Sequence, residues 1–357
     1  MGWSEIHESR SWGPVSLPLA LLSFFYGMGV KWSAKFRRKR HRLPGFVLSI
    51  GNITAGGTGK TPATMMIARW AVDRGYRAAV LSRGYGGRYD QEVLEVSDGR
   101  EIRAKVSEAG DEPVLMAENL PGVPVVVSKK RYLAGLHAQR RFQSDFFLLD
   151  DGFQHTALER DLDLVLLDAD SPFGNGRLLP WGPLREPVEN LSRATAFLIT
   201  RWEGKPVERD WEAFLGRRFP GKPLFRCAHA AGQVVFQEER HGPDFLQGKR
   251  IFAFAGIARP AAFRKTLLDA GADLVGFRGF RDHHRFTETE IRTLVSAKDS
   301  SRADLLITTE KDWVRLERLK ALCPGLAYLS ITMKVISGEE PFFDLLNSSS
   351  QERIPVQ

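Results

Sequence analysis

Residues 46–64 read FVLSIGNITAGGTGKTPAT, and this stretch constrains the fold more than any other. The apolar run 46–50 suits a buried strand, and a segment with helical spacing follows from Pro62. Between them lies a turn with four glycines that ends in Lys60 and Thr61. A buried strand, a glycine-rich turn, Lys-Thr and a helix together predict a phosphate-binding loop, in which backbone N–H groups and the helix N-terminus face phosphate.

The residue types in this turn indicate a bound nucleotide triphosphate. We expect Lys60 to contact the β- and γ-phosphates and the Thr61 hydroxyl to ligate Mg²⁺. Thr54 stands where the general loop pattern has glycine. The turn also resembles the KGGxGKT loop of membrane-associated partitioning ATPases, but Ala55 replaces the lysine of that loop. An ordinary strand-to-helix turn is the alternative, and Lys-Thr directly after the last glycine argues against it.

The composition indicates a globular protein of one large domain or two ordinary ones. The chain has 357 residues, of which 43% are hydrophobic and 26% are charged. Its two cysteines, Cys227 and Cys323, are far apart in the sequence and have no metal-binding spacing. We therefore expect a reducing compartment, and neither a disulfide framework nor a zinc site.

The positive charge is concentrated in one segment. The net charge is +8, and residues 31–42 hold seven Lys or Arg and no acid, which leaves only +1 for the rest of the chain. A nucleic-acid-binding surface would extend over the folded domain. We therefore expect no nucleic acid partner.

Residues 15–30, directly before this basic cluster, are largely apolar. As a helix they would span about 24 Å, less than the ~30 Å hydrocarbon core of a bilayer. A cleaved signal peptide would carry its positive charges before the apolar run, and a buried core helix would not need the basic cluster. An apolar helix whose Lys and Arg meet anionic headgroups explains both halves, and predicts a membrane-associated helix with in-plane or shallow insertion.

Strands that alternate with helices predict an α/β fold with a parallel sheet covered on both faces. The expected strands are residues 46–50, 77–81, 123–127, 146–149, 162–167, 196–200, 251–255, 274–277 and 305–308. Residues 203–250 are polar and rich in turn residues, which predicts a linker with a hairpin near 233–238. The polar residues after Leu346 predict a frayed tail.

Asp150 and Asp151 follow the apolar strand 146–149. A carboxylate at the end of a strand beside a phosphate-binding loop is the acid that organises Mg²⁺ in P-loop enzymes. Such an aspartate also often caps the next helix. Two together, followed by Gly-Phe-Gln-His, are more than a helix cap requires, so we expect a magnesium site here.

Four other polar motifs are ambiguous by themselves. The motif GDEP at 110–113 is also a good helix start, and the ion pair at 184–187 (LREP) has an ordinary surface interpretation. Residues 282–284 (DHH) lie between two α/β units and are a site candidate. Residues 308–312 (TTEKD) close a strand at the sheet edge where ligands bind.

Taken together and in order, these motifs resemble one family. They are SIGNITAGGTGKTP, SRGYGG, GDEP, LDDGFQH, GPLREP, FAGIARP, FRDHHRF and TTEKDWVRL. The ordered set closely resembles the tetraacyldisaccharide 4′-kinase (lipid A 4′-kinase) family of Gram-negative bacteria, from about residue 14 to about residue 335. Thr54, a departure from the general loop pattern, is what this family's loop leads one to expect.

The resemblance implies an ATP-dependent kinase of lipid A biosynthesis. It would phosphorylate the 4′-hydroxyl of a tetraacylated glucosamine disaccharide 1-phosphate to give lipid IVA, at the cytoplasmic face of the bacterial inner membrane. It also implies a P-loop NTPase-like domain and a smaller α/β domain joined by a β-ribbon, with the substrate between them. The bounds expected are 1–42 for the N-terminal helix and basic cluster, 43–225 for the P-loop domain, 226–250 for the ribbon, 251–346 for the smaller domain and 347–357 for the tail.

The resemblance also implies roles for single residues. The catalytic residues would be Lys60 and the pair Asp111 and His283, in which Asp111 takes the hydroxyl proton and His283 orients it; His284 is the other candidate partner. The nucleotide would be held by Thr54, Ala55, Gly56, Gly57, Thr58, Gly59, Lys60 and Thr61. Metal and phosphate residues would be Thr61, Asp150, Asp151 and Glu186, with Arg185 contacting phosphate. Tyr85 and Gln154 match motif positions without an assigned role.

Three alternatives compete with a lipid kinase. A membrane-associated P-loop ATPase switch is the leading one, but Ala55 and a histidine-containing second domain disfavour it. A kinase or ligase for a soluble substrate would not need the N-terminal helix. A non-enzymatic scaffold would not need so many charged motif residues.

Overall fold

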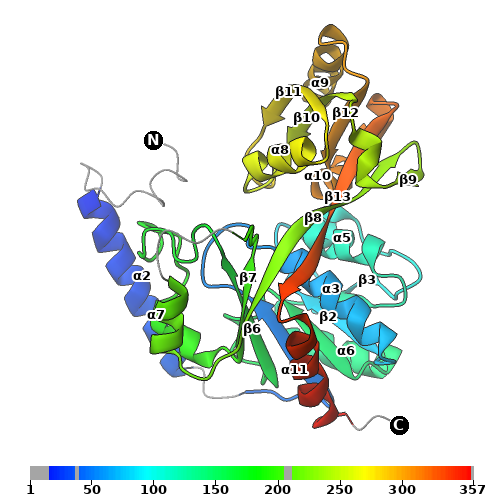
Figure 1. The fold of residues 1–357 in the computed structure, drawn as a ribbon. Coiled ribbons are helices and arrows are strands. Elements are labelled where there is room, and N and C mark those ends of the chain that lie inside the picture. Colours follow the sequence, from blue (N-terminus) through cyan, green and yellow to red (C-terminus); the bar gives the residue numbers. More distant parts are fainter. Residues whose placement is uncertain (1–15, 37–39, 205–210, 355–357) are drawn as a thin grey trace.

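The computed structural model describes residues 16–36, 40–204 and 211–354. Two lobes are joined by two long strands (Figure 1), and one sheet runs through both lobes. Its strand order is β11 (Asp273–Gly279), β10 (Arg250–Ala255), β12 (Leu305–Thr309), β13 (Leu326–Ser337), β8 (Leu224–Phe236), β7 (Ala196–Thr200), β6 (Leu162–Asp168), β1 (Phe46–Gly51), β5 (Phe146–Asp150), β2 (Ala78–Ser82), β4 (Val125–Val127) and β3 (Leu94–Ser97), and β9 (Glu239–His241) pairs with β8.

The larger lobe is built around β1, which pairs in parallel with β5 and β6. Alternate β1 residues enter different cores because successive side chains of a strand point to opposite faces. Phe46 belongs to the core that includes α3 (Lys60–Asp73) and α5 (Asp111–Asn119), whereas Val47 belongs to the core that includes α6 (Arg131–Phe142). Helices therefore cover both faces of a buried parallel sheet, as the sequence predicts.

The smaller lobe repeats this arrangement with β10, β11 and β12, which are parallel to one another. Ile251 and Ala253 of β10 face a core shared with α8 (Pro260–Asp269). Phe254 faces the opposite core, which includes α9 (Glu288–Ser300). The carboxyl ends of these strands lead into the loops that turn toward the larger lobe (Figure 1).

The two long strands β8 and β13 form an antiparallel ribbon, paired from Val235↔Tyr328 to Arg226↔Ser337. Cys227 and Val335 at one end belong to the core of the larger lobe. Val234 and Leu329 at the other end belong to the core of the smaller lobe. Each ribbon strand is thus anchored in both lobes, and the chain returns through β13 to the larger lobe.

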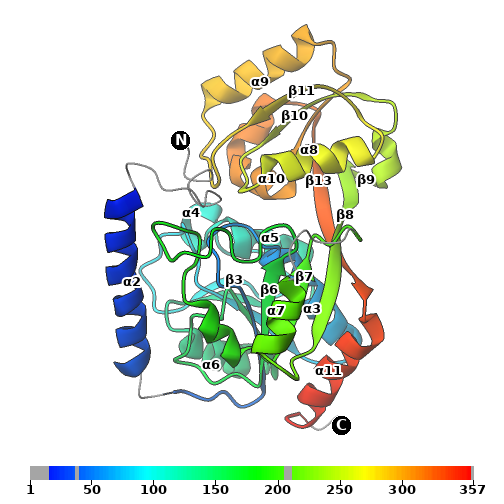
Figure 2. The same cartoon turned by 60° about the vertical axis from the view of Figure 1, so that its left-hand side comes forward.

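Helix α2 (Ser16–Phe36) lies along the outside of the larger lobe (Figures 1 and 2). Ser23 and Gly27 on one face are buried, and Ser23 Oγ donates to Leu178 O at 2.9 Å. The opposite face is apolar and exposed, with Leu17, Leu21, Leu22, Phe24, Phe25 and Met28. No helix in the described ranges is both long and apolar enough to cross a bilayer.

The remaining helices complete the two lobes. They are α4 (Val106–Ala109), α7 (Trp211–Arg218), α10 (Glu310–Leu316), α11 (Glu339–Gln351) and the 3₁₀ helices Val188–Arg193, Pro243–Leu246 and Glu317–Leu322.

Every strand expected from the sequence is present, with ends shifted by a few residues at most. The hairpin expected near 233–238 is also present, as the antiparallel pair β8–β9. Two segments differ. The expected linker 203–250 contains α7, because Trp211 and Leu215 pack into the core of the larger lobe. The expected tail begins inside α11, whose Ser350 is fully buried and hydrogen-bonds Tyr76 Oη at 2.8 Å.

Two sequence-based expectations stay open. The domain bounds 43–225, 226–250 and 251–346 stay a prediction. After the smaller lobe, the chain returns along β13 to the larger lobe, where α11 packs. In the expected basic cluster, Arg37, Arg38 and Lys39 lie outside the described residues.

Candidate active site

The expected phosphate-binding loop connects the end of β1 to the start of α3. Gly59, its last residue before Lys60, has φ of 85°, in the left-handed region that favours glycine. A Cβ atom there would lie 2.6 Å from His229 Nε2. Both backbone conformation and space therefore require glycine at this position.

Neighbouring loops hold the phosphate-binding loop from two sides. Thr54 pairs antiparallel with Leu184, and the Ala55 N–H donates to Pro183 O at 2.6 Å. This strand-like pairing gives a structural reason for a threonine where the general pattern has glycine. On the other side, Thr200 Oγ1 donates to Thr58 O at 3.0 Å and Arg201 Nη2 donates to Gly57 O at 2.7 Å.

Lys60 opens α3 directly after the loop, and its ammonium group already has two partners. Its Nζ donates to Asn52 Oδ1 at 3.2 Å and lies 3.5 Å from Asp151 Oδ1. Arg185 Nη1 donates to both Asp151 oxygens, at 3.0 and 2.8 Å. Burial would raise the pKa of Asp151, but Lys60 and Arg185 outweigh it and lower this pKa to about 2. Asp151 therefore stays ionised and holds both cations.

Asp150 has the opposite electrostatic environment, although it directly precedes Asp151. Its side chain is buried, and Ser82 Oγ donates to Oδ2 at 3.2 Å. Burial raises the pKa of Asp150, and the charges of Glu112 and Asp151 raise it further. Its Oδ1 accepts no hydrogen bond within the described part of the chain. A buried, unpartnered carboxylate oxygen is what a divalent cation needs, so Asp150 fits a Mg²⁺ ligand.

Glu186, the other acid expected at the metal, is already surrounded by donors. Gln154 Nε2 donates to Oε1 at 2.7 Å, Asn190 Nδ2 donates to Oε2 at 2.7 Å, and Arg193 Nη2 donates to both oxygens. In the described residues, no group of three His, Cys, Asp or Glu side chains is arranged to hold a metal ion. The contacts of Glu186 therefore favour a role in fixing the loop that carries Arg185.

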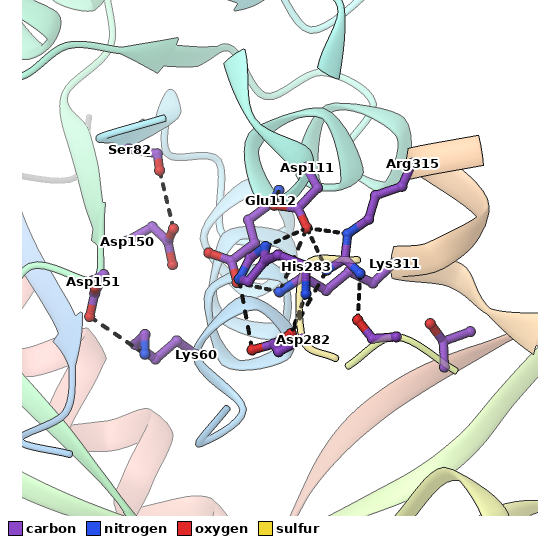
Figure 3. Close-up of polar contacts among 12 residues, drawn as sticks. Lys60, Ser82, Asp111, Glu112, Asp150, Asp151, Asp282, His283, Lys311 and Arg315 are labelled. Carbon is purple, nitrogen blue, oxygen red and sulfur yellow. Dashed lines mark hydrogen bonds and ion pairs between the residues drawn. The ribbon is translucent and has the colours of Figure 1, made fainter. Parts of the chain in front are cut away.

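Asp111 and His283 meet across the two lobes, although 172 positions separate them in the sequence. His283 Nδ1 lies 3.0 Å from Asp111 Oδ2 (Figure 3). Because an ionised carboxylate only accepts hydrogen bonds, Nδ1 is the donor. His284 lies elsewhere, with Nε2 3.0 Å from Glu290 Oε1. The structure thus brings His283, not His284, to Asp111.

The backbone at His283 has φ of 55°, which is uncommon for a residue with a side chain. Asp151 has φ of 50° and is in the same region. Such conformations persist where the surroundings enforce them, and they gather at functional sites. Both residues belong to the polar groups drawn in Figure 3.

The phosphate-binding loop and the Asp111–His283 pair belong to one region. Glu112, next to Asp111 in the chain, is close enough to Asp150 for its charge to raise the pKa of that carboxyl. Tyr85, largely exposed, meets the His283 ring edge-on with 5.7 Å between centroids. The region thus combines the expected phosphate-binding loop, a buried carboxylate with an unpartnered oxygen and a paired imidazole.

Comparison with known proteins identifies the family. The sequence profile of the tetraacyldisaccharide-1-P 4′-kinase family matches residues 15–351. The chain belongs to this family. Relatives named tetraacyldisaccharide 4′-kinase include one from Syntrophus aciditrophicus (strain SB), 42% identical over 93% of each chain. Another, from Geobacter metallireducens, is 43% identical over 92% of this chain and 93% of the relative.

A solved structure of this family supports the same assignment. LpxK from Aquifex aeolicus, crystallised in complex with ATP, matches with a TM-score of 0.76 and 32% identity. The match covers 94% of this chain and 99% of that chain. The family and the fold class predicted from the sequence are therefore confirmed for this member of the tetraacyldisaccharide 4′-kinase family.

One buried cation of this kinase was missed by the sequence reasoning. Arg131 opens α6 and is only 3% exposed. Burial lowers its pKa to about 10, and the charges of Asp150 and Asp151 act against that shift. Of the three consecutive basic residues here, Lys129 and Lys130 precede α6 and are exposed, and only Arg131 turns inward. An arginine that opens a helix a few residues after a buried strand was the available signal.

Proposed function

We propose that this kinase transfers the γ-phosphoryl group of ATP to the 4′-hydroxyl of a tetraacylated glucosamine disaccharide 1-phosphate, giving lipid IVA. Family membership supports the activity and the substrate class. The observation that carries the assignment of residues is the meeting of Asp111 and His283 beside the phosphate-binding loop. The acceptor hydroxyl would then lie between the two lobes.

The phosphates of ATP and the Mg²⁺ ion would be bound by the loop and the acids beside it. Backbone N–H groups of residues 54–61 would hold the phosphates, and Lys60 would leave Asp151 to neutralise the β- and γ-phosphates. Thr61 and Asp150 would hold Mg²⁺, which supplies further neutralisation of the phosphate charge. Arg185, which is paired with Asp151, would stabilise the negative charge that develops on the phosphoryl group during the transfer.

At the acceptor hydroxyl we assign the proton-accepting role to His283 and the orienting role to Asp111, the reverse of the roles expected from the family resemblance. Burial would raise the pKa of Asp111, but the His283 hydrogen bond and the charges of Lys311 and Arg315 hold this pKa well below its usual range. A carboxylate that is so weakly basic is a poor proton acceptor. His283 donates through Nδ1, which leaves Nε2 as the acceptor for the 4′-hydroxyl proton. Asp111 fixes this tautomer and stabilises the imidazolium that forms.

The exposed face of α2 is proposed as the contact with the membrane. Its buried face is fixed to the larger lobe: Ser23 binds Leu178, and Tyr26 Oη donates to Arg185 O at 2.9 Å. The helix thus contacts the loop that carries Arg185 while its apolar face stays open to lipid. Because ATP is made available in the cytoplasm, the membrane face would be the cytoplasmic face of the inner membrane.

Replacing two exposed phenylalanines tests this membrane contact. In Phe24→Ser/Phe25→Ser, partitioning onto anionic phospholipid vesicles should fall at least about 10-fold, because apolar side chains no longer enter the interface. ATP affinity should be unchanged, since neither side chain faces the larger lobe. Val72→Ser, an exposed apolar change on α3, is the control. Equal sedimentation of the double variant and the wild type with vesicles would place the membrane contact elsewhere.

Release of ADP distinguishes a kinase from an ATPase switch. With ATP and Mg²⁺ in detergent micelles, the purified protein should release ADP in proportion to added disaccharide 1-phosphate, and release little without it. A switch ATPase would hydrolyse ATP at the same rate in both cases. That result would contradict the proposed function.

A further inference from the structure

The motif TTEKDWVRL, residues 308–316, enters the proposed reaction only through the charges of Lys311 and Arg315. Its last seven residues form α10 in the smaller lobe, and α10 packs against α5 of the larger lobe. Figure 3 shows Lys311 and Arg315 pointing from α10 toward Asp111 and Glu112. Two cations of one lobe therefore meet two carboxylates of the other.

Arg315 makes the closer contact. Its Nε donates to Asp111 Oδ2 at 2.6 Å, and Nη2 lies 2.6 Å from the same oxygen. This is the oxygen that His283 Nδ1 contacts. The guanidinium is almost fully buried, so its charge acts on Asp111 with little screening by solvent.

Arg315 is also fixed within its own lobe. Its Nη1 donates to Gly256 O at 2.6 Å and to Asp312 Oδ1 at 2.8 Å. Asp312 is fully buried, and its Oδ2 accepts from the Gly256 N–H at 2.9 Å and from Thr309 Oγ1 at 2.7 Å. The smaller lobe thus holds the Arg315 guanidinium in a fixed orientation beside Asp111.

Lys311 completes the contact one helical turn earlier. Its Nζ donates to Glu112 Oε1 at 2.8 Å and lies 3.8 Å from Asp111 Oδ2. The Glu112 N–H in turn donates to Asp111 Oδ1 at 3.0 Å. Both oxygens of Asp111 are thereby held, which leaves the carboxylate one orientation.

We propose that Arg315 and Lys311 are positioning residues for the Asp111–His283 pair. They hold Asp111 in the orientation that His283 Nδ1 meets, and they oppose the attraction of Asp111 for the imidazolium form of His283. The pair is complete only when α10 and α5 are in contact, so proton acceptance is coupled to contact between the lobes. This inference rests on the proposed function, and it assigns two residues that act through Asp111.

The charges around His283 determine the expected pH effect. Two carboxylates face the imidazole: Asp111 at Nδ1, and Asp282, whose Oδ2 lies 3.8 Å from Nε2. The cations Arg315 and Lys311 face Asp111 from α10, and Glu112 faces Lys311 from α5. Removing a cation from this set favours the imidazolium form of His283. As the pH falls, the neutral imidazole needed for proton acceptance is then lost at a higher pH than in the wild type.

Arg315→Gln, Arg315→Lys and Lys311→Gln test the inference, with Arg318→Gln as the exposed control from the same segment. Arg315→Gln should lower kcat about 10²-fold, as small misplacements of a reacting group do. The acidic limb of its pH–kcat profile should move up by about one pH unit. Lys311→Gln should move the limb in the same direction by less, Arg315→Lys should restore part of kcat, and KM for ATP should change little in all of them.

A second readout does not depend on turnover. In ¹⁵N-histidine NMR titrations, the curve of His283 should move to higher pH in Arg315→Gln and should not move in Arg318→Gln. If Arg315→Gln does not fold, Lys311→Gln carries both measurements. A folded variant with wild-type kcat, an unmoved acidic limb and an unmoved His283 titration would overturn the inference. A wild-type protein that does not phosphorylate the lipid would instead overturn the proposed function, and the NMR titration would still decide the positioning role.

Discussion

Replacing Lys60 with alanine should lower kcat by at least about 10²-fold while the fold stays intact. In the proposed reaction Lys60 neutralises charge that develops on the transferring phosphoryl group, and loss of one such contact costs this much. The side chain is not part of a hydrophobic core, and within the described part of the chain its ammonium group contacts Asn52 and Asp151. The measurement is the steady-state rate of lipid phosphorylation, with thermal unfolding as the check on folding.

Lys130→Ala is the matched control for Lys60→Ala. Lys130 is exposed and pairs with the exposed Glu92, and such surface pairs contribute little. Its variant should keep the wild-type rate. A folded Lys60→Ala that also keeps this rate would show that the loop is not the catalytic phosphate site.

Removing either member of the Asp111–His283 pair should cost roughly 10²–10⁴-fold in kcat, as loss of a general base does. The double variant Asp111→Ala/His283→Ala should be little slower than the slower single variant, because residues that act as one unit are strongly non-additive. Nucleotide affinity should change little in all three variants. Rates of the wild type, both single variants and the double variant complete the cycle.

Two further variants make this cycle specific. His284→Ala should be near wild type, because His284 pairs with Glu290 and not with Asp111. Asp111→Asn keeps the shape of a side chain that Arg315 contacts, and separates loss of charge from loss of packing. If the losses multiply in the double variant, Asp111 and His283 act independently. If His283→Ala keeps the wild-type rate, the imidazole takes no part in the reaction.

The phosphate end of the site was predictable from local sequence. A buried strand, a glycine turn and Lys60-Thr61 specify a phosphate-binding loop within a few residues of one another, and Asp150 ends the neighbouring strand β5. The difference between Asp150 and Asp151 needed the structure, because it arises from Lys60 and Arg185 beside Asp151 and from burial and Glu112 at Asp150.

The acceptor end was predictable only through the family resemblance. His283 lies 172 positions from Asp111, and Arg315 lies 204 positions from it. Local spacing carries no information on contacts of this kind. The motif TTEKDWVRL was visible as a strand end, but its contact with α5 depends on how the ribbon of β8 and β13 places one lobe on the other.

The misassigned segments have a common cause. Residues 203–250 and the residues after Leu346 are polar overall, so a reading of average polarity predicts a linker and a tail. Trp211 and Leu215 form one apolar stripe in α7, and Phe342 and Leu346 form another in α11. A few apolar residues at helical spacing decide burial where the average does not.

The most direct test of the central claim is the position of the new phosphate on the lipid. The protein is incubated with ATP, Mg²⁺ and the tetraacylated disaccharide 1-phosphate, and the product is analysed by mass spectrometry and ³¹P–¹H correlation NMR. We expect one added phosphate, coupled to the proton at the 4′ position, and no such product with Lys60→Ala. ADP release without a phosphorylated lipid, or a phosphate on another hydroxyl, would contradict the assignment.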